Sequence, residues 1–171
     1  MKNWMKVFLF CLTSILFIGC DRITKNLAKE HLMFHEPISY LHNTVRLEYV
    51  ENTGAALSLG DQLSKPVSFW LLSVIPLVCL LVLAGYVLTK INTYNPLKLF
   101  SFALIIAGGL GNIIDRLLFD RHVTDFMNVG ISNVRTGIFN VADMCVTAGV
   151  IGLLLSLREK KVDLQAEQEA N

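Results

Sequence analysis

Two aspartates stand in apolar stretches of the sequence, and their surroundings are alike. Asp115 ends the stretch GGLGNIID, and Asp143 lies in FNVAD. Each follows an asparagine by three residues, Asn112 and Asn140, a spacing that places amide and carboxylate on one helical face. Two carboxylates held close together share a proton, so one can act as a base on water while the other acts as an acid toward a carbonyl. The pattern indicates the chemistry of an aspartic protease.

The depth of the two aspartates along their helices supports this pairing. A helix from Leu97 reaches Asp115 after about 27 Å, nearly the thickness of the hydrocarbon core. A helix entering from that boundary at Gly137 reaches Asp143 after about 9 Å. Both carboxylates are therefore expected near the same membrane face. An ionisable residue inside a span indicates function, although each aspartate could instead pair with a basic neighbour, as Asp115 with Arg116.

The elements that position these residues follow from composition. The chain has 171 residues, of which 53% are hydrophobic and 17% charged. Its mean hydropathy is +0.52. Apolar stretches recur at about 4–20, 67–89, 97–116 and 137–157, each of a length that suits a membrane helix. The sequence predicts one integral membrane domain with an all-α core of four transmembrane helices. The net charge of +1 gives no reason to expect a nucleic-acid partner.

Basic residues orient the chain, because Lys and Arg collect in short cytoplasmic loops. Those that flank the spans on one side are Lys2, Lys6, Lys90, Lys98 and Arg158. Both termini are therefore expected in the cytoplasm, with the active site facing the outer side.

Two outer segments remain, at about 21–66 and 117–136. RITKNLAKEHL is expected to continue the first helix to the membrane surface. YLHNTVRLEYVEN alternates apolar and polar residues, which predicts a short strand pair and hence a small extracytoplasmic β-containing lobe. The second segment is expected to be an outer loop. The polar tail, about 160–171, is expected to be disordered.

Other chemistries have less support. The sequence contains no G-x-S-x-G, and the His35-Glu36 pair is not followed by a second zinc-binding histidine. The four cysteines lie in predicted spans without paired spacing. The hypothesis therefore needs no metal and no cofactor. The glycines at 108, 109 and 111 leave a notch on the third span, which serves either helix packing or the entry of substrate backbone.

Five motifs, in order along nearly the whole chain, resemble those of the bacterial lipoprotein signal peptidases, the signal peptidase II family. They are DRITK (Asp21, Lys25), NTGAA (Asn52, Gly54), GGLGNIIDR (Gly108, Asn112, Asp115, Arg116), VTDF (Asp125) and FNVAD (Asn140, Ala142, Asp143). The chain departs from the family at Leu57, where an aromatic residue is usual.

The resemblance implies that Asp115 and Asp143 are the catalytic pair and that the other motif residues bind substrate or support the pair. It implies a diacylglyceryl-modified prolipoprotein as substrate, cut just before its lipidated cysteine. It also implies a multi-pass protein of the bacterial inner membrane that acts as a monomer, contacts membrane lipid and binds the cyclic-peptide inhibitors known for the family.

Three alternatives stay open at this point. LFIGC, ending at Cys20, imitates the cleavage site of a lipoprotein signal peptide, but three further spans follow, so the first segment is expected to be retained. A proton- or cation-coupled transporter could use paired aspartates, although it would more often place acids in both halves of its spans. A membrane-assembly factor would need neither aspartate.

Overall fold

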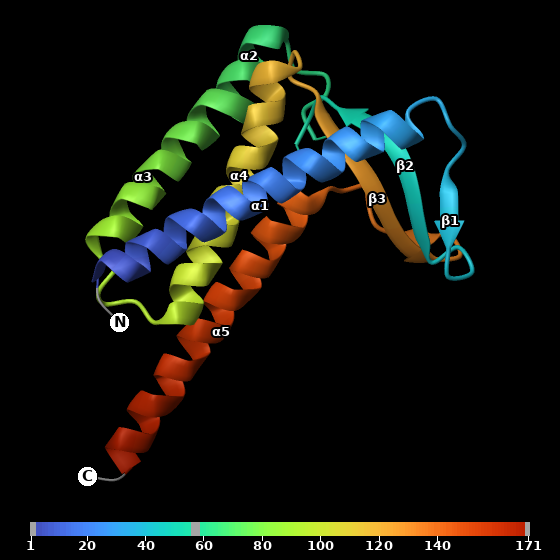
Figure 1. Ribbon diagram of the computed structural model, residues 1–171. Coiled ribbons are helices and arrows are strands. Elements are labelled where there is room, and N and C mark those ends of the chain that lie inside the picture. Colours follow the sequence, from blue (N-terminus) through green and yellow to red (C-terminus); the bar gives the residue numbers. More distant parts are fainter. Residues whose placement is uncertain (1–2, 56–58, 170–171) are drawn as a thin grey trace.

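The computed structural model describes residues 3–55 and 59–169. Its elements are helices α1 (Asn3–Leu32), α2 (Lys65–Phe69), α3 (Ile75–Thr89), α4 (Pro96–Leu118) and α5 (Val141–Glu169), the π-helix η2 (Trp70–Val74), and strands β1 (Ile38–Tyr40), β2 (Val45–Asn52), β3 (Val123–Ile131) and β4 (Val134–Arg135). The long helices form a bundle, and the strands form a lobe beside the C-terminal half of α1 (Figure 1). This is the predicted class, a helical core with a small β-containing lobe.

Three helices of the described chain are long and apolar enough to cross a membrane: α1, the continuous helix Lys65–Thr89, and α4. A fourth apolar helix, Val141–Leu157, is shorter. The sequence predicts that this span begins at residue 137, and the structure corrects that start. The preceding residues stay extended because Phe139 pairs with Met127, with N···O distances of 2.8 and 2.9 Å.

The far end of α5 also differs from expectation. The helix continues to Glu169, where the sequence predicts a disordered tail from about residue 160. The segment REKKVDLQAEQE has no apolar face, but it consists largely of strong helix formers such as Glu, Lys, Gln, Leu and Ala. Local propensity therefore favours helix here.

The helix Lys65–Thr89 contains one turn of π-helix, η2, just before Pro76. Proline has no N–H to donate to the carbonyl four residues earlier, here that of Leu72, and a wider turn accommodates the missing bond. The irregular turn lies beside the cavity described below, which Leu72 and Pro76 help to line.

Small residues let α4 approach its neighbours closely. A Cβ at Gly108 would collide with the carbonyl oxygen of Ala142, and one at Gly149 would lie 2.6 Å from the carbonyl oxygen of Ser101. The backbones of α4 and α5 are thus in direct contact near both ends of their interface, as small residues allow in membrane proteins. This contact brings the start of α5 against the outer half of α4.

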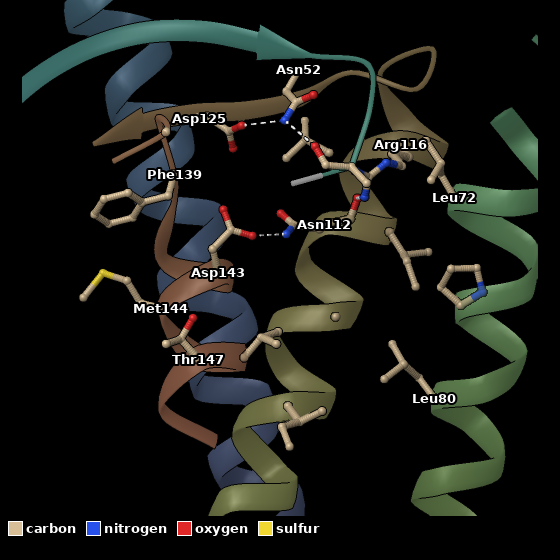
Figure 2. Close-up of a pocket in the computed structure, with 18 of the residues that line it drawn as sticks. Asn52, Leu72, Leu80, Asn112, Arg116, Asp125, Phe139, Asp143, Met144 and Thr147 are labelled. Carbon is tan, nitrogen blue, oxygen red and sulfur yellow. Dashed lines mark hydrogen bonds between the residues drawn. The ribbon is translucent and has the colours of Figure 1, made fainter. Parts of the chain in front are cut away.

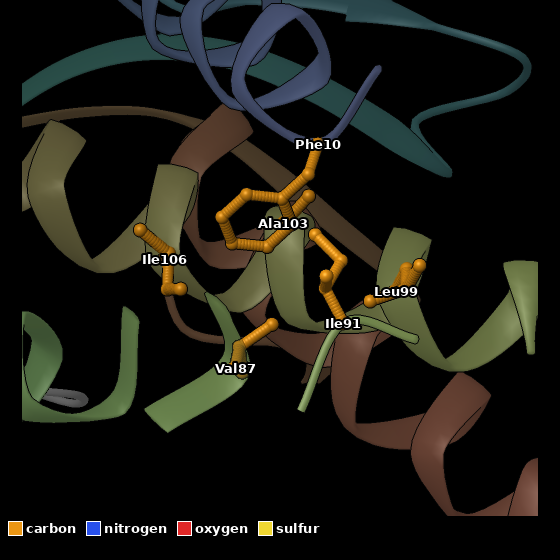
Figure 3. Packing of buried hydrophobic residues seen from close by; sticks show 6 residues of the cluster. All are labelled: Phe10, Val87, Ile91, Leu99, Ala103 and Ile106. Carbon is orange, nitrogen blue, oxygen red and sulfur yellow. The ribbon is translucent and has the colours of Figure 1, made fainter. Parts of the chain in front are cut away.

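An apolar cluster closes the opposite end of the bundle. It joins α1, α3 and α4 through Phe10, Val87, Ile91, Leu99, Ala103 and Ile106, all buried (Figure 3). Lys6 lies beside this cluster and donates to the carbonyls of Ile91, Asn92 and Tyr94 at 3.1–3.3 Å. The loop between α3 and α4 is thereby attached to α1.

The lobe is an antiparallel sheet in the order β1-β2-β3-β4. The predicted strand pair is present as β1 and β2, with Tyr40 opposite Val45. The segment 117–136, expected as a loop, instead contributes β3 and β4. The sequence VTDFMNVGI does not alternate apolar and polar residues, because both faces of β3 are covered. Asp125 and Phe126, which point to opposite faces, are both buried.

Candidate active site

A cavity of about 1040 Å³ lies between α3, α4 and α5, below the strands in Figure 2. Its lining includes a polar set, Asn52, Asn112, Arg116, Asp125 and Asp143, and a longer apolar set that includes Leu72, Leu80, Ile105, Ile113, Val146 and Ile151. A concave site with a few polar groups at one end of an apolar wall is the usual form of a ligand site. This one suits an extended apolar substrate with its reacting bond at the polar end.

Asp143 lies in the first turn of α5, because Asn140 caps that helix. The Asn140 Oδ1 accepts from the N–H of Asp143 at 3.0 Å, and Asp143 Oδ2 accepts from the N–H of Asn140 at 3.2 Å. This reciprocal pair is a capping box, so the spacing of three reflects a helix start rather than a shared helical face. The cap holds the Asp143 carboxylate at the polar end of the cavity.

Asp125 reaches the same end of the cavity from β3, not from the outer loop that the sequence predicts. Its carboxylate accepts from the amides of Asn52 at 3.1 Å and Asn140 at 2.7 Å. Burial, the first cause, and the nearby Asp143 carboxylate raise the pKa of Asp125 to about 6, against the hydrogen bonds from Asn52 and Asn140, which lower it. This carboxyl therefore takes up a proton at a higher pH than an ordinary aspartate.

The side chain of Asn112 connects the cavity with a buried ionic cluster. Its Oδ1 accepts from Lys25 and from Asn140, each at 3.0 Å. With the oxygen occupied in this way, its Nδ2 points to the Oδ1 of Asp143, at 2.8 Å. The orientation of the amide is thus set by two donors, and it directs a hydrogen bond to a cavity carboxylate.

Asp115 does not line the cavity. It is 1% exposed and belongs to the buried cluster, where it pairs with Arg22 and, at 2.9 Å, with the Lys25 ammonium. The expected meeting of Asp115 with Asp143 at the cavity is therefore not what the structure has. The helical turn that carries Asp115 presents it to α1, so it satisfies charges there, and Asp125 takes the place beside Asp143.

Asp21 completes the buried cluster and joins α1 to α5. Its carboxylate pairs with Lys25 at 2.8 Å and accepts from the N–H of Ala142 at 2.8 Å. A carboxylate at a helix N-terminus stabilises the first turn. Close approach depends on Gly111, where a Cβ would lie 2.7 Å from the Asp21 carboxylate and 3.2 Å from the Ala142 methyl.

Arg116 and the NTGAA motif close the polar end of the cavity. Arg116 Nη2 donates to the carbonyl of Gly54 at 2.6 Å, and the N–H of Gly54 donates to Asn52 Oδ1 at 2.9 Å. Asn52 also donates to the carbonyl of Ala55 at 3.2 Å. Residues 52–55 of the motif thus form a compact turn fixed to α4, while Ala56 and Leu57, the predicted departure, lie outside the described residues.

One residue of the cluster is missing from the predicted site. Arg22 pairs with Asp115, donates to Asn26 at 3.1 Å, and places its guanidinium 4.6 Å from the ring centroid of Phe119. Its i, i+4 spacing to Asn26, next to the same spacing of Asp21 and Lys25, is a signal in the sequence for one polar face on α1.

Comparison with known proteins places the chain in a family. The model of Signal peptidase (SPase) II matches residues 13–158. The lipoprotein signal peptidase of Francisella tularensis subsp. novicida is 37% identical over 156 residues, covering 89% of this chain and 93% of its own. That of Streptococcus agalactiae is 34% identical over 153 residues, covering 90% and 94%.

Solved structures agree. A bacterial membrane enzyme determined by the in meso method at 2.3 Å resolution superposes with a TM-score of 0.78 at 27% identity, covering 92% of each chain. Another, at 1.9 Å resolution, gives 0.74 at 28% identity, covering 88% of this chain and 93% of its own. With its apolar helices, the chain is a multi-pass membrane protein, and it belongs to the signal peptidase II family of lipoprotein signal peptidases.

Proposed function

We propose that this peptidase is an aspartic endopeptidase with Asp125 and Asp143 as its catalytic pair. Its substrate would be a diacylglyceryl-modified prolipoprotein, cut just before the lipidated cysteine. The observation that carries the proposal is the position of these two carboxylates, both at the polar end of one cavity. Asp115, the partner expected from the sequence, is enclosed by cations outside that cavity.

The two carboxyls take different roles. Asp125 holds the proton, because its pKa is raised to about 6. Asp143 is the base, and both of its oxygens accept hydrogen bonds, from Asn112 and from the N–H of Asn140. These bonds orient the carboxylate toward a water placed between the pair. A preorganised base and acid on opposite sides of one peptide group lower the cost of attack.

The proposed hydrolysis proceeds through proton transfers between water, the two carboxyls and the peptide group. Asp143 removes a proton from water while the water oxygen bonds to the scissile carbonyl carbon. At the same time Asp125 gives its proton to the carbonyl oxygen. The tetrahedral intermediate collapses when Asp143 returns its proton to the nitrogen of the lipidated cysteine and the C–N bond breaks. Asp125 recovers its proton as the carboxylic acid of the signal peptide forms. Protons and bonds balance without another reactant.

The apolar length of the cavity supports the choice of substrate. Its wall runs from Leu72 to Ile151 along α3, α4 and α5, which fits an apolar signal helix lying between them. The acyl chains of the modified cysteine would stay in lipid beside this wall. Arg116 and Asn52, at the polar end, are placed to contact the peptide backbone or the ester groups.

The test is cleavage of a diacylglyceryl-modified lipobox peptide by the purified full chain. Asp125→Asn and Asp143→Asn should each lose about 10²–10⁴-fold or more in turnover, the usual range for an acid–base partner. Each should still bind substrate, measured separately. Asp120→Asn is the matched control, since Asp120 is exposed and its pair with Lys65 lies at the surface. A chelator should leave turnover unchanged.

Asp115→Asn separates the two possible pairs. This change leaves Arg22 and Lys25 with fewer partners in a buried site, so it should lower the melting temperature. The fraction that remains folded should turn over faster than either cavity variant. If Asp125→Asn kept more than about a tenth of parental turnover, below the usual acid–base contribution, while folded Asp115→Asn was inactive, Asp115 would be the partner of Asp143.

A further inference from the structure

Three aliphatic side chains project from the tips of the sheet. Leu41 lies in the turn between β1 and β2, and Ile131 and Val134 flank the turn between β3 and β4. They are 73%, 77% and 83% exposed. Ile131 and Val134 are directly opposite each other in the antiparallel pair, so they stand on one face. We call these three residues the aliphatic tip.

The two turns that carry the aliphatic tip form one rigid unit. The N–H of Gly130 donates to the carbonyl of Thr44 at 2.8 Å. Arg135 donates to the carbonyl of Asn43 at 2.7 Å, and Asn43 accepts from Arg46 at 2.6 Å. The turn between β1 and β2 and the turn between β3 and β4 are far apart in the sequence, but these bonds hold them side by side. Their exposed side chains form a common surface.

The backbone conformation of the turn between β1 and β2 is unfavourable for leucine. Leu41, His42 and Asn43 have φ values of 50°, 52° and 67°. Glycine and asparagine adopt this left-handed region readily, whereas leucine does not. Neither turn preference nor burial accounts for Leu41, so its apolar surface is explained by what lies outside the protein.

Charge and position identify the partner as lipid. Segments 38–46 and 128–136 contain Arg46, Arg135 and His42 but no carboxylate, which suits phosphate headgroups. In Figure 1 the sheet lies to one side of the bundle, and its two turns point toward the end of the molecule where the termini lie.

Apolar surface also continues from the bundle toward the lobe. On the outer half of α1, Ile23 and Leu27 are 61% and 49% exposed, and Phe34, just past the end of the helix, is 93% exposed. These residues extend the lipid-facing side of α1 to the sheet. A membrane partner accounts for both surfaces at once.

We propose that the aliphatic tip inserts into the bilayer at the boundary of headgroups and acyl chains, with Arg46 and Arg135 at the phosphates. The sheet is then a second membrane contact, fixed to the helices yet distinct from them. Amphipathic surfaces with basic residues behind apolar ones bind such boundaries. The proposal does not depend on the assignment of the catalytic pair.

The test uses the full chain in vesicles of phosphatidylcholine, with and without phosphatidylglycerol. In a variant without native cysteines, Leu41→Cys or Val134→Cys carries an environment-sensitive fluorophore. Glu30→Cys, at an exposed polar site on the outer end of α1, is the matched control. We expect blue-shifted emission at both tip positions and quenching by lipid-borne spin labels at least about threefold stronger than at the control, as for a surface-inserted helix.

The remaining outcomes overturn the proposal. Equal quenching at the tip and at Glu30→Cys would show that the tip stays in water. A blue shift that appears only after adding lipidated substrate would make the partner a polypeptide. A shift that grows with the protein-to-lipid ratio would make it a second copy of the chain. Arg46→Gln should weaken quenching in phosphatidylglycerol vesicles more than in phosphatidylcholine alone, and the absence of that difference would remove the role of the arginines.

Discussion

At the scale of single residues, the amide of Asn140 joins three parts of the site. It is fully buried, and its Nδ2 donates to Asp125, Asn112 and the carbonyl of Thr124, at 2.7, 3.0 and 3.3 Å. Its oxygen at the same time caps α5 above Asp143. One side chain thus sets the distance between a strand carboxyl and a helix carboxylate, which gives the pair a fixed geometry.

The raised pKa of Asp125 predicts a pH profile. The acid role needs the protonated carboxyl, and this form is lost as the pH rises through the pKa of about 6. The alkaline limb of kcat/KM, which reports the free enzyme, should therefore begin near that value. Initial rates with the lipidated peptide across a pH series would measure it.

Asn52→Ala gives the control for this profile. The Asn52 amide stabilises ionised Asp125, so removing it should raise the pKa further and move the alkaline limb to higher pH. A purely structural loss would lower the rate at every pH and leave the limb in place. That result would exclude Asp125 as the titrating acid.

The limits of prediction at this scale are clear from Asp115 and Asp125. Both stand in motifs, and helix depth alone favours Asp115. Its actual surroundings are set by Arg22 and Lys25, some 90 residues earlier in the chain. No periodicity encodes such a contact, because it depends on which faces of α1 and α4 meet. Asn112, Asn140 and Asp143 lie together in the structure, as their types and spacing predict.

At the scale of elements, the contact of α4 with α5 predicts the effect of a single methyl group. Gly108→Ala places a Cβ against the carbonyl of Ala142 and should destabilise the chain by about 1–3 kcal/mol, the usual cost of overpacking. Gly85→Ala on α3 meets no atom within 4 Å and should be neutral or slightly stabilising. Melting in detergent compares the two, and equal melting temperatures would refute the close contact.

Elements divide into those that local pattern encodes and those that contacts create. The apolar runs of the long helices and the hairpin around His42 could be read from composition and alternation. Strand β3 could not, because it is buried on both faces and polar at Asp125 and Asn128. The sequence also predicts the start of the last helix too early, because the pairing of Phe139 with Met127 keeps the preceding residues extended.

At the scale of the whole molecule, the basic flanks predict orientation. With both termini in the cytoplasm, β1 lies outside and the loop between α3 and α4 inside. Ser39→Cys and Asn92→Cys, each exposed, report the two sides in a variant without native cysteines. An impermeant maleimide added from outside to spheroplasts should label Ser39→Cys and not Asn92→Cys. The opposite labelling would invert the molecule and place the cavity's polar end in the cytoplasm.

The bond between Asp21 and the N–H of Ala142 spans 121 positions and has a consequence for biogenesis. A ribosome releases α1 long before α5 exists, so the nascent first helix carries Asp21 and Lys25 without their later partners. A charged pair is costly in hydrocarbon. Helix α4 is the first later helix to compensate Lys25, because Asn112 and Asp115 both contact its ammonium. A chain stopped after α4 can already form the pairs of Arg22 and Lys25 with Asp115, and the arrival of α5 adds the bond from its first turn to Asp21.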